Sequence, residues 1–204
     1  DIVRTLPAED IPVQALRGVS VLQRRGERSV FIFPRNLTRS PQSVTFTLTL
    51  PDGTQTLFPS HIPLYIGPQR MKMLPVHVPL DKNLTLAYST SEIFSVMRYG
   101  GETIIIAYGD PGERGEILLR GAAGFDHLRG GGTAAVESGG VLVSYLHRKG
   151  AFHILLTSGD VNEHPERPRG VRIIAVDRET VERTWLMETS RGRLPILSNA
   201  YFLD

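Results

Sequence analysis

Apolar and polar residues alternate along much of this chain, and a period of two favours a fold built from strands. The clearest example covers residues 43–50. Four apolar residues of this segment fall on one face of an extended chain: Val44, Phe46, Leu48 and Leu50. Successive side chains of a strand point to opposite faces, so the segment predicts a strand that is buried on one face. The turn residues Pro51-Asp52-Gly53 follow, and 54–58 is the expected returning strand.

The same pattern of short strands and tight turns recurs along the chain. Three more hairpins are predicted from their strand pairs: 19–22 with 29–33, 93–98 with 103–108, and 141–146 with 152–157. A further strand is expected at 116–120, and the apolar run 171–176 predicts a strand buried on much of both faces. Short strands separated by frequent turns predict an all-β fold, an antiparallel β-sandwich-type domain rich in hairpins.

One short helix is predicted near the C-terminus. Asp177 is a suitable N-cap for residues 178–184, because its carboxylate can accept a hydrogen bond from an otherwise unpaired early N–H. Val181 and Trp185 are four residues apart, and we expect both to face the core. A helix of this length is not stable alone in water, so packing on a sheet must stabilise it.

The length of 204 residues favours one domain or two small ones, and we predict a single β domain over 1–204. Residues 121–132, which end in three glycines, are the candidate for a subdomain seam or a long loop. No apolar run approaches the roughly 20 residues of a membrane-spanning helix, so no membrane span is expected. The sequence starts at Asp1 without an initiator Met or an apolar signal core, and we interpret this as an internal or processed start.

Composition excludes several kinds of site. The chain has no cysteine, which rules out disulfides, thiolate zinc sites and a cysteine nucleophile. The net charge is only +2, and the arginines are scattered apart from two small groups: Arg24, Arg25 and Arg28, then Arg167, Arg169 and Arg172. Nucleic-acid binding needs clustered positive charge, so we expect no nucleic-acid partner.

Catalytic and metal-binding signals are weak. The densest acidic stretch contains five carboxylates, several of them at predicted turns where solvated acids are common: Glu92, Glu102, Asp110, Glu113 and Glu116. The six histidines have no metal-ligand spacing: His61, His77, His127, His147, His153 and His164. The sequence also lacks a nucleophile elbow and a phosphate-binding glycine loop. We therefore predict no catalytic residue, cofactor or metal. The triplets Asn36-Leu37-Thr38 and Asn83-Leu84-Thr85 match the N-glycosylation pattern, which also occurs by chance.

Several ordered motifs resemble one known family. Residues 84–94, Leu-Thr-Leu-Ala-Tyr-Ser-Thr-Ser-Glu-Ile-Phe, are similar to a stretch in the second domain of the β-galactosidases of glycoside hydrolase family thirty-five. The similarity continues through the hairpin 99–109 and the turn Asp110-Pro111-Gly112-Glu113. It resumes at Ala175-Val176-Asp177-Arg178 with Trp185, and again at Asn199-Ala200-Tyr201-Phe202. The motifs span residues 28–202 in order.

This resemblance implies an all-antiparallel β domain that follows a (β/α)₈ catalytic barrel, in a secreted or periplasmic parent. The family's acid and nucleophile glutamates lie on the barrel, and none of their motifs occurs here. We therefore expect a non-catalytic accessory domain that packs against the barrel and whose hairpin loops wall its substrate cleft. The candidate docking residues are the turn residues Asp110, Pro111 and Glu113, with Asp177 at the helix entry.

Other functions are kept open. An autonomous carbohydrate-binding module would need exposed rings, whereas the tyrosines mostly fall within strand patterns: Tyr65, Tyr88, Tyr99, Tyr108, Tyr145 and Tyr201. A self-sufficient hydrolase would need an acidic pair such as Glu92 with Glu116. A structural or adhesion module is the last alternative. The candidate partners are therefore the barrel of the same parent chain and, second, a carbohydrate.

Overall fold

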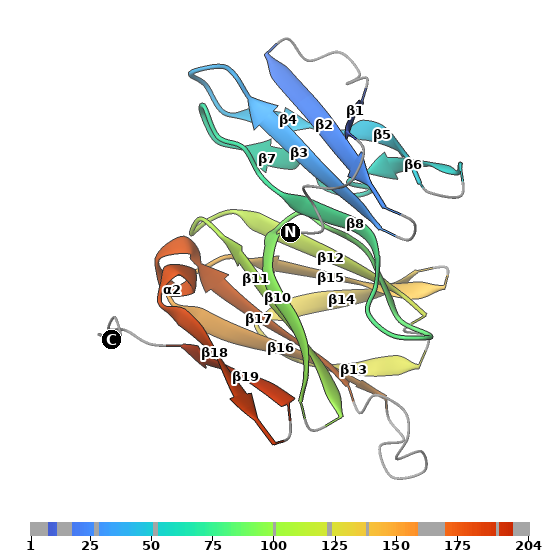
Figure 1. The fold of residues 1–204 in the computed structure, drawn as a ribbon, viewed down its shortest axis with the longest axis vertical. Coiled ribbons are helices and arrows are strands. Elements are labelled where there is room, and N and C mark those ends of the chain that lie inside the picture. The colour runs from blue at the N-terminus through green and yellow to red at the C-terminus, as the bar shows by residue number, and fades with distance from the viewer. Residues whose placement is uncertain are drawn as a thin grey trace. The chain divides into compact units, whose positions relative to one another are not determined.

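The computed structural model describes residues 8–11, 18–26, 29–50, 53–99, 101–121, 124–137, 139–158, 170–190 and 192–197 (Figure 1). Strands dominate, and the described part of the chain has one α-helix, α2 (Arg178–Glu182). The prediction of an antiparallel all-β fold with one short helix near the C-terminus is confirmed. The predicted turn residues Pro51 and Asp52, residue Gly100 between the predicted strands 93–98 and 103–108, and the motif at 199–202 lie outside the described residues.

Contacts divide the chain into two compact units. Unit 1 comprises Asp1–Glu92 with Glu116–Arg120, and unit 2 comprises Ile93–Gly115 with Gly121–Asp204. Compactness does not show that a unit folds independently, so the single domain with a seam at 121–132 stays a prediction.

Unit 1 contains one main sheet and two small strand pairs. The order of strands in the main sheet is β1 (Ala8–Asp10), β2 (Val19–Arg25), β3 (Val30–Asn36), β8 (Leu74–Pro79), β9 (Thr85–Ser89) and β12 (Arg114–Arg120). The small pairs are β4 (Gln42–Val44) with β7 (Leu64–Ile66) and β5 (Phe46–Thr49) with β6 (Gln55–Phe58). The hairpin predicted near the start is β2–β3, and the strand predicted at 116–120 is β12.

The apolar residues of the segment 43–50 are buried as predicted, but the segment is not one continuous strand. Its four apolar residues are all buried: Val44, Phe46, Leu48 and Leu50. The strand is interrupted at Thr45, because the chain pairs first with β7 and then with β6. Phe58 on β6 contacts both Phe46 and Tyr88, with ring centroids 5.2 and 5.4 Å apart, so the β5–β6 pair packs on the main sheet.

Unit 2 contains a seven-stranded sheet. Its order is β13 (Phe125–Gly130), β16 (Ala151–Ser158), β17 (Gly170–Asp177), β11 (Glu102–Gly109), β10 (Glu92–Tyr99), β19 (Gly192–Leu197) and β18 (Thr184–Thr189). The predicted hairpin at 93–108 is β10–β11. The resemblance implies antiparallel pairing throughout, but β11 and β17 are parallel. Parallel strands are usually buried on both faces, which agrees with the apolar run of β17.

The predicted pairing of 141–146 with 152–157 is wrong. β15 (Gly140–Leu146) pairs with β14 (Gly132–Glu137), whereas β16 pairs with β13 and β17. The glycines at 130–132 allow this change of partner, because Gly130 has φ +112° and a Cβ there would lie 2.0 Å from the His153 carbonyl oxygen. The alternative of a long loop at 121–132 is also wrong, since β13 runs through it.

The helix begins as predicted but ends earlier. Asp177 is its N-cap, and α2 stops at Glu182, so Thr184 already starts β18. Val181 is buried and packs with Ile104, Ile106 and Val176. The prediction that Trp185 faces the core is wrong: it lies on a strand, and its side chain is 42% exposed.

Candidate functional site

Two parallel strands of unit 2 end side by side, and this brings the predicted docking residues together. In the β11–β17 register Gly109 lies opposite Asp177, the last residue of each strand. The turn 110–113 therefore leaves the sheet beside the start of α2. All four predicted docking residues lie at this position, which we call the β11–β17 end: Asp110, Pro111, Glu113 and Asp177.

The turn at 110–113 is fixed by its own hydrogen bonds. The Asp110 N–H donates to Glu113 Oε2 at 3.1 Å, and the Glu113 N–H donates to the Asp110 carbonyl at 3.0 Å. Two hydrogen bonds to His147, the residue after β15, hold the turn in place. The Gly112 N–H donates to the His147 carbonyl, and the His147 N–H donates to the Glu113 carbonyl. Gly109 is required here, because a Cβ would lie 2.7 Å from the His147 ring.

Asp177 positions the backbone and is largely inaccessible. Its Oδ1 accepts from the Thr180 N–H at 2.7 Å and its Oδ2 from the Gly150 N–H at 2.9 Å. Burial by itself raises the pKa of Asp177, but these hydrogen bonds and the charge of Lys149 outweigh it and lower the pKa. Asp177 therefore stays ionised as a structural cap.

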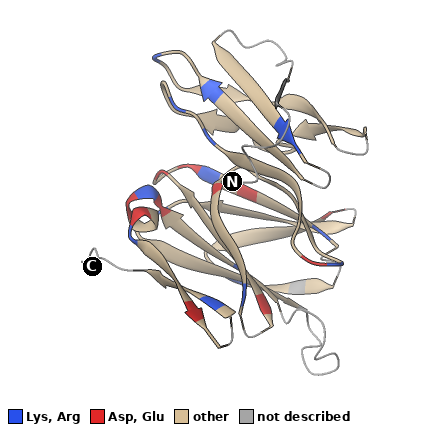
Figure 2. Ribbon diagram, in the orientation of Figure 1, with Lys and Arg blue, Asp and Glu red and all other residues tan. Residues whose placement is uncertain are grey.

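Arg178 links the helix to the turn. Its Nε lies 3.4 Å from Asp110 Oδ1, and its guanidinium lies over the Tyr108 ring at 5.3 Å from the centroid. Figure 2 shows acidic and basic residues next to one another at α2. Because Asp110 is half-exposed and Pro111 exposed, these two present the accessible surface of the β11–β17 end.

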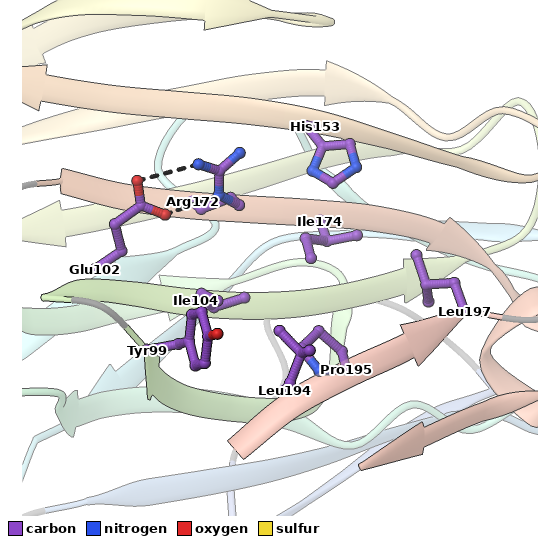
Figure 3. A pocket seen from close by; sticks show the side chains of 9 residues that line it. All are labelled: Tyr99, Glu102, Ile104, His153, Arg172, Ile174, Leu194, Pro195 and Leu197. Carbon is purple, nitrogen blue, oxygen red and sulfur yellow. Dashed lines mark hydrogen bonds and ion pairs between the residues drawn. The ribbon is translucent and has the colours of Figure 1, made fainter. Parts of the chain in front are cut away.

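A shallow groove of about 520 Å³ lies on one face of the same sheet (Figure 3). Its apolar lining comes from the three strands β11, β17 and β19: Ile104, Ile174, Leu194, Pro195 and Leu197. At one end Glu102 and Arg172 form a two-point ion pair, with N–O distances of 2.9 and 3.0 Å. Tyr99 and His153 complete the lining. The groove can hold an apolar side chain next to a polar end.

Large apolar side chains are exposed on two strands of this sheet. They are Phe94 and Val96 on β10 with Trp185, Leu186 and Met187 on β18, all between 39% and 43% exposed, and we call them the exposed apolar set. Because side chains alternate along a strand, Trp185 and Met187 lie on one face of β18 and Leu186 on the other. The sequence prediction missed this set because it assigned Trp185 to a helix.

Comparison with protein families decides what kind of domain this is. The family model for "Beta-galactosidase, domain 2" matches residues 14–181, most of the chain. The chain belongs to the β-galactosidase domain 2 family. The sequence resemblance to the second domain of such enzymes is thereby confirmed. The match covers the whole β11–β17 end, whereas β18 and β19 follow it.

Other comparisons add little to the family assignment. A search of curated proteins found no match. Among solved structures, the γ-CGTase of the alkalophilic Bacillus clarkii is similar at 12% identity and a TM-score of 0.23. The alignment covers 82% of this chain and 25% of that chain, so this β-galactosidase domain 2 spans about a quarter of that protein's length. A TM-score this low supports no argument about function.

The acids considered as a catalytic pair are buried in unit 1 of the β-galactosidase domain 2. Glu92 Oε1 accepts from the Met73 N–H at 3.2 Å, and Glu116 Oε2 accepts from the Tyr88 hydroxyl at 3.2 Å. Both side chains are less than 10% exposed. Among the residues that the structure describes, no group of three His, Cys, Asp or Glu side chains could hold a metal ion. No helix in these parts is long and apolar enough to cross a membrane.

Tyr88 should make unit 1 sensitive to high pH. Burial of the phenol raises the pKa of Tyr88 to about 12; the Ser60 hydrogen bond opposes the rise and the charge of Glu116 adds to it. A raised pKa means that folding favours the neutral phenol, so its contribution to stability is complete below pH ~10 and is lost as the pH rises toward 12.

We expect urea-denaturation midpoints of the wild type to fall between pH 10 and 12 more steeply than those of Tyr88→Phe. Tyr65→Phe is the matched control, because the Tyr65 ring is 43% exposed on β7. Equal slopes for wild type and Tyr88→Phe would contradict the assignment.

Proposed function

We propose that this chain is a non-catalytic accessory domain of a β-galactosidase-like glycoside hydrolase and packs against the (β/α)₈ barrel of the same parent. The match to the β-galactosidase domain 2 family supports the kind of parent. The observation that supports the packing is the number of large apolar side chains left exposed on β10 and β18, since such side chains favour burial against another surface; Trp185 and Met187 lie on one face of β18 and Leu186 on the other.

The proposed interface has two parts. The groove supplies apolar contacts together with Leu186, which is paired with the groove residue Pro195, and it accepts an apolar side chain of the barrel beside the Glu102–Arg172 pair. The β11–β17 end supplies polar contacts through Asp110 and Glu113 and an apolar contact through Pro111, while Asp177 holds the helix start in place. Loops near this end are the candidates for walling the substrate cleft, since barrel sites open toward the loops that follow the strands.

The carbohydrate-binding alternative has less support. A binding module of this kind needs several rings on one surface, and the exposed aromatic residues of the described chain are distributed over separate strands: Tyr65 on β7, Phe94 on β10 and Trp185 on β18. This alternative stays a prediction. Titration of the isolated chain with galactosides is the direct measurement for it.

The packing is tested with charged substitutions that matter only in the parent. Leu186→Lys with Met187→Lys should change the unfolding free energy of the isolated chain by less than about 0.5 kcal/mol, because both side chains are exposed. In the full-length parent the same pair should cost about 1–3 kcal/mol, because interface positions lose contacts that an isolated domain does not make.

The control for this experiment is Val136→Lys on β14, whose side chain is 81% exposed. It should be neutral in both proteins. Thermal unfolding and galactoside turnover are measured for each variant, with and without the barrel. Turnover by the isolated chain would contradict the accessory role, and equal effects in chain and parent would contradict packing through the exposed apolar set.

A further inference from the structure

The two Asn-X-Thr triplets of unit 1 have opposite structural environments. Asn36 ends β3 in the interior, whereas Asn83 lies in the turn between β8 and β9. We propose that Asn83 is an N-glycan acceptor of this domain and that Asn36 is not. This inference is independent of the packing proposed above.

The Asn36 amide is fully committed to the fold. Its side chain is 0% exposed, and Nδ2 donates to the carbonyls of Ser40, Ile66 and Gly67 at 2.7–3.2 Å. Oδ1 accepts from both the N–H and the hydroxyl of Thr38, each at 2.8 Å. A sugar on Nδ2 would remove a donor and require space that the interior lacks. A chain modified at Asn36 therefore cannot reach this structure.

The Asn83 amide is available. The residue is exposed, and among the described residues its side chain has no hydrogen-bond partner. The turn holds its shape without that side chain: the N–H groups of Leu80 and Asp81 both donate to the Leu84 carbonyl, at 2.9 and 3.0 Å. Leu84 is buried and anchors the turn. A glycan at Asn83 would therefore extend into solvent without disturbing the fold.

The modification is a group transfer with a defined balance. The donor is an oligosaccharide joined through its anomeric carbon to a polyprenyl pyrophosphate. A bond forms between Asn83 Nδ2 and that carbon, the bond from the carbon to the pyrophosphate oxygen breaks, and the lipid pyrophosphate leaves. Nδ2 loses one proton, and no electron is exchanged. Thr85 supplies the third residue of the acceptor triplet.

The test uses the 204-residue chain, secreted from a eukaryotic host behind a cleavable signal sequence. The folded, secreted fraction is treated with an amidase that releases N-glycans in heavy-oxygen water, which leaves a mass label at each formerly modified asparagine. We expect the label at Asn83 and none at Asn36. An independent reading comes from gel mobility, in which the wild type should shift by one glycan on amidase treatment.

Three variants keep the proposal falsifiable. Asn83→Gln and Thr85→Ala should both abolish the mobility shift, and Thr85→Ser, which preserves the triplet, should retain it. All three change partly or wholly exposed positions of unit 1 and should fold. A folded protein labelled at Asn36, or a secreted wild type with no label at Asn83, would overturn the proposal.

Discussion

Replacing Asn36 with Asp should be among the most destabilising single changes available in unit 1, at about 3–5 kcal/mol of unfolding free energy. The wild-type Nδ2 faces three carbonyl oxygens, and the substitution would put a carboxylate oxygen in its place. Thr38 would still donate to the other oxygen, but the new oxygen would be buried against three acceptors with no donor of its own. Urea denaturation followed by circular dichroism measures the loss.

The pH dependence of this loss separates charge from lost hydrogen bonds. Burial of the charge against three carbonyl oxygens should raise the pKa of the introduced carboxyl above its unfolded value of roughly 4. The destabilisation of Asn36→Asp relative to wild type should therefore be smallest below pH ~4 and should grow as the pH rises above that value. Hydrogen exchange should show the opening in β3 and β7, because Asn36 joins the end of one strand to the end of the other.

Asn83→Asp is the matched control for this experiment. It makes the same chemical change at an exposed turn position, where we expect an effect of less than about 0.5 kcal/mol. If Asn36→Asp were as mild as Asn83→Asp, the hydrogen-bond network around Asn36 would not be important for stability.

The positions of the strands were largely predictable, because alternation and turn residues are local signals. β5–β6, β2–β3 and the N-cap at Asp177 were all predicted from short segments. Partner choice was not predictable in the same way. The pattern of 141–146 fits pairing with β14 or with 152–157 equally well, and tertiary packing decides between them.

The candidate site shows the same division. The turn at Asp110 and the cap at Asp177 were each predicted. They lie close together because β11 and β17 pair in parallel. This pairing joins distant parts of the chain, since the contacting residues Asp110 and Arg178 are 68 residues apart. Parallel partners this distant leave no local pattern in one sequence. Trp185 was misassigned because a spacing of four from Val181 fits a helix, and the early end of α2 depends on the fold around it.

Gly130→Ala should cost unit 2 about 3–5 kcal/mol, because two penalties act at the same position. The residue has φ +112°, which L side chains rarely adopt, and its new Cβ would lie 2.0 Å from the His153 carbonyl oxygen and 3.2 Å from the Ile154 Cα. These are backbone atoms of β16, so a side-chain rotation cannot relieve the contact. Either β13 must move away from β16, or the chain must leave its pairing with β16 at a different residue.

Gly124→Ala carries only the backbone-strain part of this penalty, so its difference from Gly130→Ala gives the steric part. Gly124 has φ +116°, nearly the same backbone strain, but nothing lies within 4 Å of its would-be Cβ. We expect about 1–2 kcal/mol for this control from strain alone. Urea denaturation followed by the fluorescence of Trp185, the single tryptophan and a residue of unit 2, measures both variants. Losses equal within about 0.5 kcal/mol would contradict the close approach of β13 to β16, and with it the explanation of why the chain changes partner at these glycines.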